Sequence, residues 1–156
     1  MADPLLTARQ AVERGAPDAR QRLEEALASV SRDRHARMTW AQLSEEAGAS
    51  DLACREYERL LAESPDDPEV LEHLRTVYEE RGDVARAVEA ARHLWRVRPD
   101  AGACEALCQL LVAAGHEDEA RRVAGEAVAR GLAVAPLDES RLPETAAYDL
   151  FDVPFE

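Results

Sequence analysis

Apolar residues recur between Pro68 and Asp100 at the spacing of two consecutive amphipathic helices. In the first half they fall three and four residues apart, which places them on one face of a helix: Leu71, Leu74, Val77 and Tyr78. The second half repeats this arrangement: Ala87, Val88, Ala91, Leu94 and Trp95. Asp67 suits the N-cap position of the first helix, Gly82 marks the turn, and Pro99 ends the second helix. The pattern predicts a helix–turn–helix unit.

The same pattern recurs on both sides of this unit at a step of 33 or 34 residues. The positions that keep the step are glycines, small alanines, apolar residues and prolines: Gly48, Gly82 and Gly115; Ala53, Ala87 and Ala120; Leu60, Leu94 and Ala127; Pro65 and Pro99. A worn fourth copy precedes them, in which Leu6, Ala19, Leu23 and Ala26 keep the step of 34. A fixed period of this length indicates one supersecondary unit that is repeated and stacked. In the degenerate N-terminal copy, the period predicts helices near residues 4–14 and 17–31.

These positions, in register, resemble the tetratricopeptide repeat (TPR) family over about residues 34–132, and more weakly over residues 1–33. Cys108 and Leu132 depart from the pattern, since the family usually has a very small residue and a proline there. The resemblance implies an all-α, right-handed solenoid of helix–turn–helix repeats, with about three clear units and one degenerate N-terminal unit. We expect these units at about residues 1–33, 34–67, 68–100 and 101–133. The family's fold also implies a concave groove, formed by the first helix of each unit, that holds a segment of a partner protein.

Residues 134–156 break the repeat and form an acidic, aromatic C-terminal tail. Its large apolar residues include both phenylalanines of the chain: Tyr148, Leu150, Phe151 and Phe155. Two interpretations stay open. The tail caps the exposed apolar face of the last unit, or it is a linear motif that docks on another protein with its aromatic side chains as anchors. The arginine-bearing second helices match its charge better than the first helices, which allows self-association through the tail.

The formal net charge of −13 argues against a general affinity for nucleic acid or anionic membranes, since both are polyanions. All the basic residues are Arg, and Lys, Asn and Ile are absent, which indicates a GC-rich and hence bacterial genome. No stretch has the roughly 20 apolar residues of a membrane span, and the N-terminus has no signal-peptide core. We therefore expect a cytoplasmic protein.

The non-core face of the predicted first helices is the candidate partner-binding groove, and it is rich in Glu. Its residues are Met38, Gln42, Glu45, Glu69, Glu72, Thr76, Glu79, Glu105 and Gln109, with His35 and Val112 beside them. The predicted second helices instead carry arginines: Arg55, Arg59, Arg86, Arg92, Arg96, Arg121 and Arg122. An acidic groove favours a basic or polar–apolar peptide as partner. The alternative interpretation is a solvated charged face that binds no ligand.

The sequence carries no motif for catalysis or for a cofactor. It has no Gly-rich phosphate loop, no His-Glu-x-x-His and no Ser elbow, so we expect neither enzymatic activity nor a cofactor. Cys104 and Cys108 lie one helical turn apart, but no further ligands stand at a recognised metal-site spacing from them. We interpret both of them, and Cys54, as small buried thiols of the core and predict no metal site.

The function that these patterns predict is a non-enzymatic protein–protein interaction module. It would serve as an adaptor, scaffold or regulator of a bacterial complex and bind a partner segment in the concave groove. The alternative is a chaperone-like assembly or secretion factor that holds a client peptide.

Overall fold

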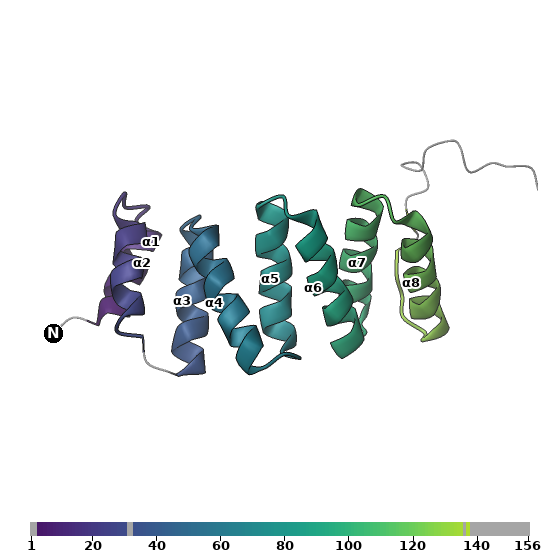
Figure 1. Ribbon diagram of the computed structural model, residues 1–156, viewed down its shortest axis with the longest axis horizontal. Coiled ribbons are helices and arrows are strands. Elements are labelled where there is room, and N and C mark those ends of the chain that lie inside the picture. The colour runs from purple at the N-terminus through teal and green to yellow at the C-terminus, as the bar shows by residue number, and fades with distance from the viewer. Residues whose placement is uncertain (1–2, 31–32, 136, 138–156) are drawn as a thin grey trace, which may run out of the picture.

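The computed structural model describes residues 3–30, 33–135 and 137, and these ranges hold eight α-helices and no strand. The helices are α1 (Pro4–Glu13), α2 (Ala19–Leu27), α3 (Arg34–Glu46), α4 (Ser50–Glu63), α5 (Pro68–Glu80), α6 (Val84–Val97), α7 (Ala101–Ala113) and α8 (Glu117–Ala129). Consecutive helices pack into four hairpins, which stand side by side in one row from α1 to α8 (Figure 1). The predicted all-α helical-repeat solenoid is confirmed.

The worn N-terminal copy forms a helical pair, but its second helix is shorter than the predicted residues 17–31. Pro17 and Asp18 lie in a turn, so α2 begins only at Ala19. It ends at Leu27, and the amides of Ser29 and Val30 both donate to the carbonyl of Ala26 at 2.9 Å.

An aspartate caps the first helix of every pair. The caps are Asp3, Asp33, Asp67 and Asp100, whose carboxylates accept hydrogen bonds from backbone amides of the first helical turn. The Asp100 carboxylate, for example, accepts from the amide of Ala103 at 2.8 Å. Such a cap contributes about 1 kcal/mol to helix stability because it satisfies an amide that has no partner within the helix. The caps therefore fix where each first helix begins.

The turn inside each pair depends on a glycine with positive φ. Gly82 has φ 71°, a left-handed conformation in which an L side chain is strained. This bend lets the amide of Asp83 donate to the carbonyl of Tyr78 at 2.8 Å, which closes the end of α5. Positive φ recurs at Gly15, Gly48, Gly115 and Gly131.

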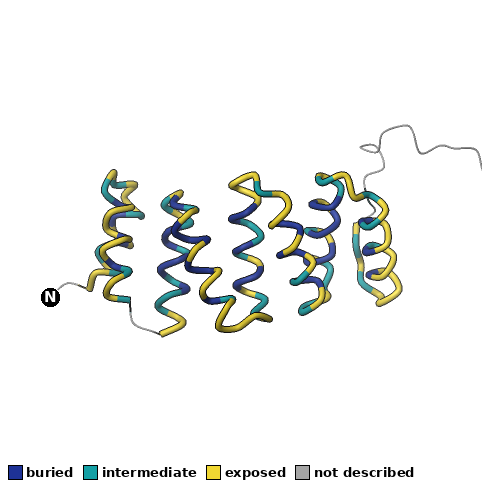
Figure 2. Tube along the Cα trace, in the orientation of Figure 1, coloured by how far each residue is buried: buried dark blue, intermediate teal, exposed yellow. Residues whose placement is uncertain are grey.

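The core is one continuous cluster that runs through all four pairs (Figure 2). The recurring alanines Ala53, Ala87 and Ala120 are all 0% exposed, so two helices approach closely at each of them. Large side chains pack beside these alanines, and Trp40, Leu74 and Leu107 are at most 2% exposed. This alternation of small and large residues is the packing that the repeat pattern predicts.

The three cysteines are buried and free, as expected for core thiols. The Sγ atoms of Cys104 and Cys108 lie 3.9 Å apart inside α7, facing α8. Burial raises the pKa of Cys108 to about 12, so this thiol stays protonated at neutral pH. Among the described residues, no group of three or more His, Cys, Asp or Glu side chains is placed to hold a metal ion.

After α8 the chain runs back beside this helix (Figure 1). Leu132, Val134 and Leu137 are partly buried and pack against the core cluster. No helix in the described part of the chain is long and apolar enough to cross a membrane.

Replacing Gly82 by Ala should lower the free energy of unfolding by about 1–2 kcal/mol, because alanine is strained at φ 71°. Urea unfolding followed by circular dichroism measures the change. Gly125→Ala is the matched control, since Gly125 lies inside α8 with nothing within 4 Å of an added Cβ. It should stabilise the protein by about 0.5–1 kcal/mol. Equal effects of the two substitutions would contradict the assigned turn.

Candidate partner-binding groove

Two neighbouring first helices, α3 and α5, border a hollow of about 470 Å³. Its lining residues are Gln42, Glu45, Glu46, His73 and Glu80, and we call it the first-helix pocket. Glu45 and Glu46 lie about one turn after Gln42 on α3, while His73 and Glu80 lie two turns apart on α5. Two of the predicted groove residues, Gln42 and Glu45, are thus brought together in one hollow.

A hydrogen-bond network centred on His73 joins the two units at this pocket. His73 Nδ1 lies 3.1 Å from the Glu45 carboxylate, and Tyr57 from α4 donates its hydroxyl to the same carboxylate at 2.9 Å. The Tyr57 and His73 rings stack with centroids 5.1 Å apart. The Gln42 amide nitrogen lies 3.3 Å from His73 Nε2. In neutral His73, Nδ1–H therefore donates to Glu45 and Nε2 accepts from Gln42.

The network shifts the pKa of each titratable member. The hydrogen bond to Glu45 raises the pKa of His73 above its usual 6.5, against the opposing effect of burial, and the charges of Glu69 and Glu72 add to the rise. Burial raises the pKa of Glu45, but hydrogen bonds from His73 and Tyr57 outweigh this effect, so its net pKa is lowered. Burial and the Glu45 charge raise the pKa of Tyr57, which stays a neutral hydrogen-bond donor.

One predicted groove residue is not on the surface. Met38 is 4% exposed and belongs to the core cluster, so its assignment to the non-core face is wrong. Helical spacing alone does not distinguish a residue at the edge of the core from a residue on the open face. Methionine at such an edge can fill irregular gaps between helices. Val112 is partly buried and also packs against the core. His35 is exposed.

Arginines neutralise several of the other predicted groove residues. The Glu72 carboxylate accepts from Arg98 at 2.9 Å, Glu79 pairs with Arg75, and Glu69 lies 4.0 Å from Arg34. The Thr76 hydroxyl donates to the backbone carbonyl of Glu72 at 3.1 Å, within its own helix. Glu105 and Gln109 are exposed on α7, away from the first-helix pocket.

The segregation of charge by helix is therefore incomplete. Arg34, Arg37 and Arg75 lie on first helices, and Arg37 Nε donates to the buried Glu56 of α4 at 2.5 Å. Two glutamates of the first-helix pocket keep their negative charge without a counter-ion. No described cation lies within ion-pair distance of Glu46 or Glu80, and both are exposed.

Three pocket residues were missing from the predicted set: Glu46, His73 and Glu80. Glu46 and Glu80 belong to acidic pairs that are ordinary at solvated helix positions. The repeat pattern could have identified these two glutamates, because they lie 34 residues apart and hold equivalent positions in neighbouring units. No sequence signal distinguished His73. The tail residues Tyr148, Leu150, Phe151 and Phe155 lie outside the described residues.

No protein-family model matches the chain, and neither does any curated protein. Solved structures do match. MamA AMB-1 superimposes with a TM-score of 0.62 and 19% identity, over 90% of this chain and 77% of that one. A crystal structure of MamA gives 0.63 and 18% over 82% and 76%. A thermophilic TPR protein of Thermus thermophilus gives 0.51 and 23% over 81% and 72%. These matches show the TPR fold and support the resemblance that the repeat pattern carries.

The His73–Glu45 pair should stabilise the protein in a defined pH window. A raised histidine pKa contributes stability that is present at low pH and lost as the pH rises through the folded pKa, above about 6.5. The lowered Glu45 pKa contributes stability that is lost as the pH falls through it, below about 4.5. The pair should therefore contribute most between these limits. NMR titration of the His73 ring should give a pKa above 6.5 that Glu45→Gln lowers.

The control for this titration is Glu72→Gln, which removes a more distant and smaller contribution to the His73 pKa. It should lower that pKa less than Glu45→Gln does. An unshifted His73 pKa in the native protein would show that the pair does not form in solution.

Proposed function

We propose, from the TPR fold of this chain, that it is a non-enzymatic protein–protein interaction module whose first-helix pocket binds a basic side chain of a partner segment. In the bacterial cell this activity would make it an adaptor or scaffold. The observation that carries the proposal is the chemistry of the pocket. Three glutamates line one hollow between two repeats, and no arginine lines it.

An arginine or lysine of a partner fits this arrangement electrostatically. Carboxylates bind the planar guanidinium group through two parallel hydrogen bonds, and such bonds are stronger than neutral ones. Glu46 and Glu80 approach the pocket from α3 and α5, so a cation between them would contact both repeats. The Glu45 charge is already shared with His73 and Tyr57. Glu46 and Glu80 are therefore the carboxylates with the most capacity left for a partner.

The chaperone-like alternative receives less support from this face. A holder of unfolded clients needs exposed apolar surface. The large apolar residues that are exposed in the described ranges are Leu6, Val84 and Val128, and none of them lines the first-helix pocket. The pocket instead has the polar lining of a site that selects a charged group.

Replacing Glu46 and Glu80 together by Gln should weaken the binding of a basic peptide about tenfold, since two partly screened ion pairs contribute about 1.4 kcal/mol. Peptides selected from a random twelve-residue library against the full chain provide the probe. We expect Arg or Lys to be enriched in them. Fluorescence anisotropy with one selected peptide then measures the affinity of each variant.

The matched control is the double variant Glu25→Gln with Glu126→Gln, which removes the same charge from exposed positions of α2 and α8. It should leave the affinity nearly unchanged. If it weakens binding as much as the pocket variant does, the interaction is a general charge effect. Selected peptides without basic residues would also refute the proposal.

A further inference from the structure

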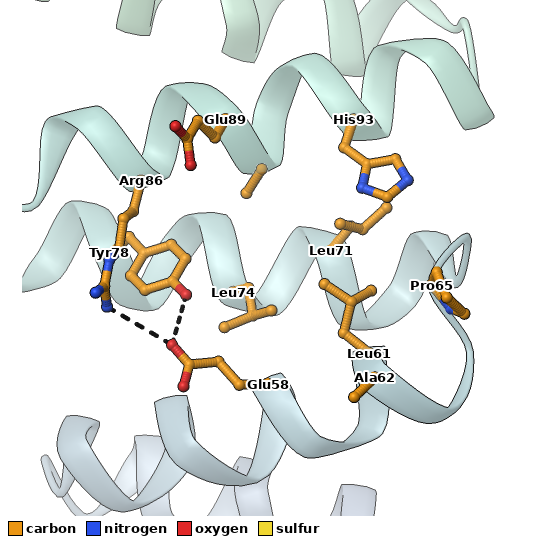
Figure 3. A pocket seen from close by; sticks show the side chains of 11 residues that line it. Glu58, Leu61, Ala62, Pro65, Leu71, Leu74, Tyr78, Arg86, Glu89 and His93 are labelled. Carbon is orange, nitrogen blue, oxygen red and sulfur yellow. Dashed lines mark hydrogen bonds and ion pairs between the residues drawn. The ribbon is translucent and has the colours of Figure 1, made fainter.

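A second hollow, of about 540 Å³, lies on the other side of the array between the second helices α4 and α6 (Figure 3). Its middle is apolar: Leu61 and Ala62 come from α4, Leu71 and Leu74 from α5, and Ala90 from α6. Its volume lies within the range of about 300–1,000 Å³ that is typical of ligand pockets. We call it the α4–α6 slot.

The repeat register explains why this slot is open. The positions equivalent to Leu61 and Leu74 are tryptophans in the neighbouring units: Trp95 lies 34 residues after Leu61, and Trp40 lies 34 residues before Leu74. Trp40 Nε1–H donates to the Leu23 carbonyl of α2 at 2.7 Å, so its indole contacts the preceding unit.

At the junction between the third and fourth units, Trp95 takes the place that Trp40 has at the first junction. The Arg130 guanidinium, at the end of α8, lies 5.2 Å from the Trp95 ring centroid. Arg92 and Glu119 bind each other through two hydrogen bonds of 2.8 and 2.6 Å between α6 and α8. An indole thus fills each flanking junction, whereas the α4–α6 slot has leucine at both equivalent positions. Its shape therefore suits an aromatic side chain supplied from elsewhere.

The slot lining is mixed in charge, because Arg86 lines it together with Glu58 and Glu89. Two further arginines of α6, Arg92 and Arg96, lie outside the lining, and Arg92 pairs with Glu119. No described anion lies within ion-pair distance of Arg96. At the rim, Glu58 is already engaged, since it accepts from the Tyr78 hydroxyl at 2.8 Å and lies 3.7 Å from Arg86 (Figure 3). Glu89 has no described cation within ion-pair distance, so the acidic groups of an occupant would lie toward Arg96, outside the lining.

We propose that the α4–α6 slot binds the chain's own C-terminal segment, residues 148–155, with Phe151 as the anchor in the apolar middle. The segment supplies the aromatic ring that the slot lacks, and Asp149 and Asp152 beside the anchor would face Arg96. No other part of the chain contains phenylalanine.

The segment is long enough to reach the slot within one molecule. Leu137 packs against the core beyond α8, so thirteen residues separate it from Phe151. At about 3.3 Å per residue an extended chain of this length spans about 43 Å. Neighbouring helices pack about 8–10 Å apart, so the three helix spacings from α8 back to α5 amount to about 24–30 Å.

Methyl NMR of the full chain, labelled at leucine, tests the proposal. A docked phenylalanine ring shifts nearby methyl resonances upfield. We expect such shifts for Leu61, Leu71 and Leu74, and Phe151→Ala should remove them. Leu142→Ala is the matched control, because it removes a large apolar side chain from the tail outside residues 148–155 and leaves the ring in place. Leu74→Trp, which places in the slot the residue that the preceding unit has as Trp40, should release the segment as Phe151→Ala does.

Three results would overturn the proposal. Unchanged leucine shifts in the Phe151→Ala variant would show that the slot is empty. Shifts that vanish on dilution would show that the occupant is the tail of a second copy. Shifts confined to Val128, in a sample also labelled at valine, would show that the tail caps the open face of α8 instead.

Discussion

The close approach of two helices at an alanine is the contact on which the rest of this structure depends. Ala53, Ala87 and Ala120 are completely buried, each inside the second helix of its pair. A larger side chain at any of them would push the helices apart and expose the apolar residues beside it. Because a single pair cannot bury both of its apolar faces, the pairs must also stack on one another.

Stacking creates both candidate sites, since each lies at a junction between units. The first-helix pocket is bordered by α3 and α5, and the α4–α6 slot lies over the opposite side of α5. The character of each junction depends on which residues occupy equivalent repeat positions. Glutamates at 46 and 80 leave the pocket acidic, whereas leucines at 61 and 74 leave the slot apolar and open. One fold thus carries two surfaces of different chemistry.

Repetition made the helices easy to predict and the individual sites hard to predict. The turn at Gly82 and the start of α6 at Val84 follow from backbone conformations that only local residues determine. Met38 shows where prediction from helical spacing fails. A residue at the edge of an apolar stripe can face either the core or the groove, and the spacing is the same in both cases. His73 was not recognised, since its role depends on Glu45, Tyr57 and Gln42, which come from another unit.

The sequence by itself determined the eight helices, their turns and the repeat that stacks them. Those features depend on helix propensity, capping and apolar spacing within about 34 residues, and the same pattern recurs in each repeat. Tertiary structure alone decided which charges stay unpaired and where a hollow opens. Arg98 neutralises Glu72 from a distance of 26 residues along the chain, while Glu46 and Glu80 meet no described cation. Such pairings depend on side-chain directions across a junction, which no local pattern records.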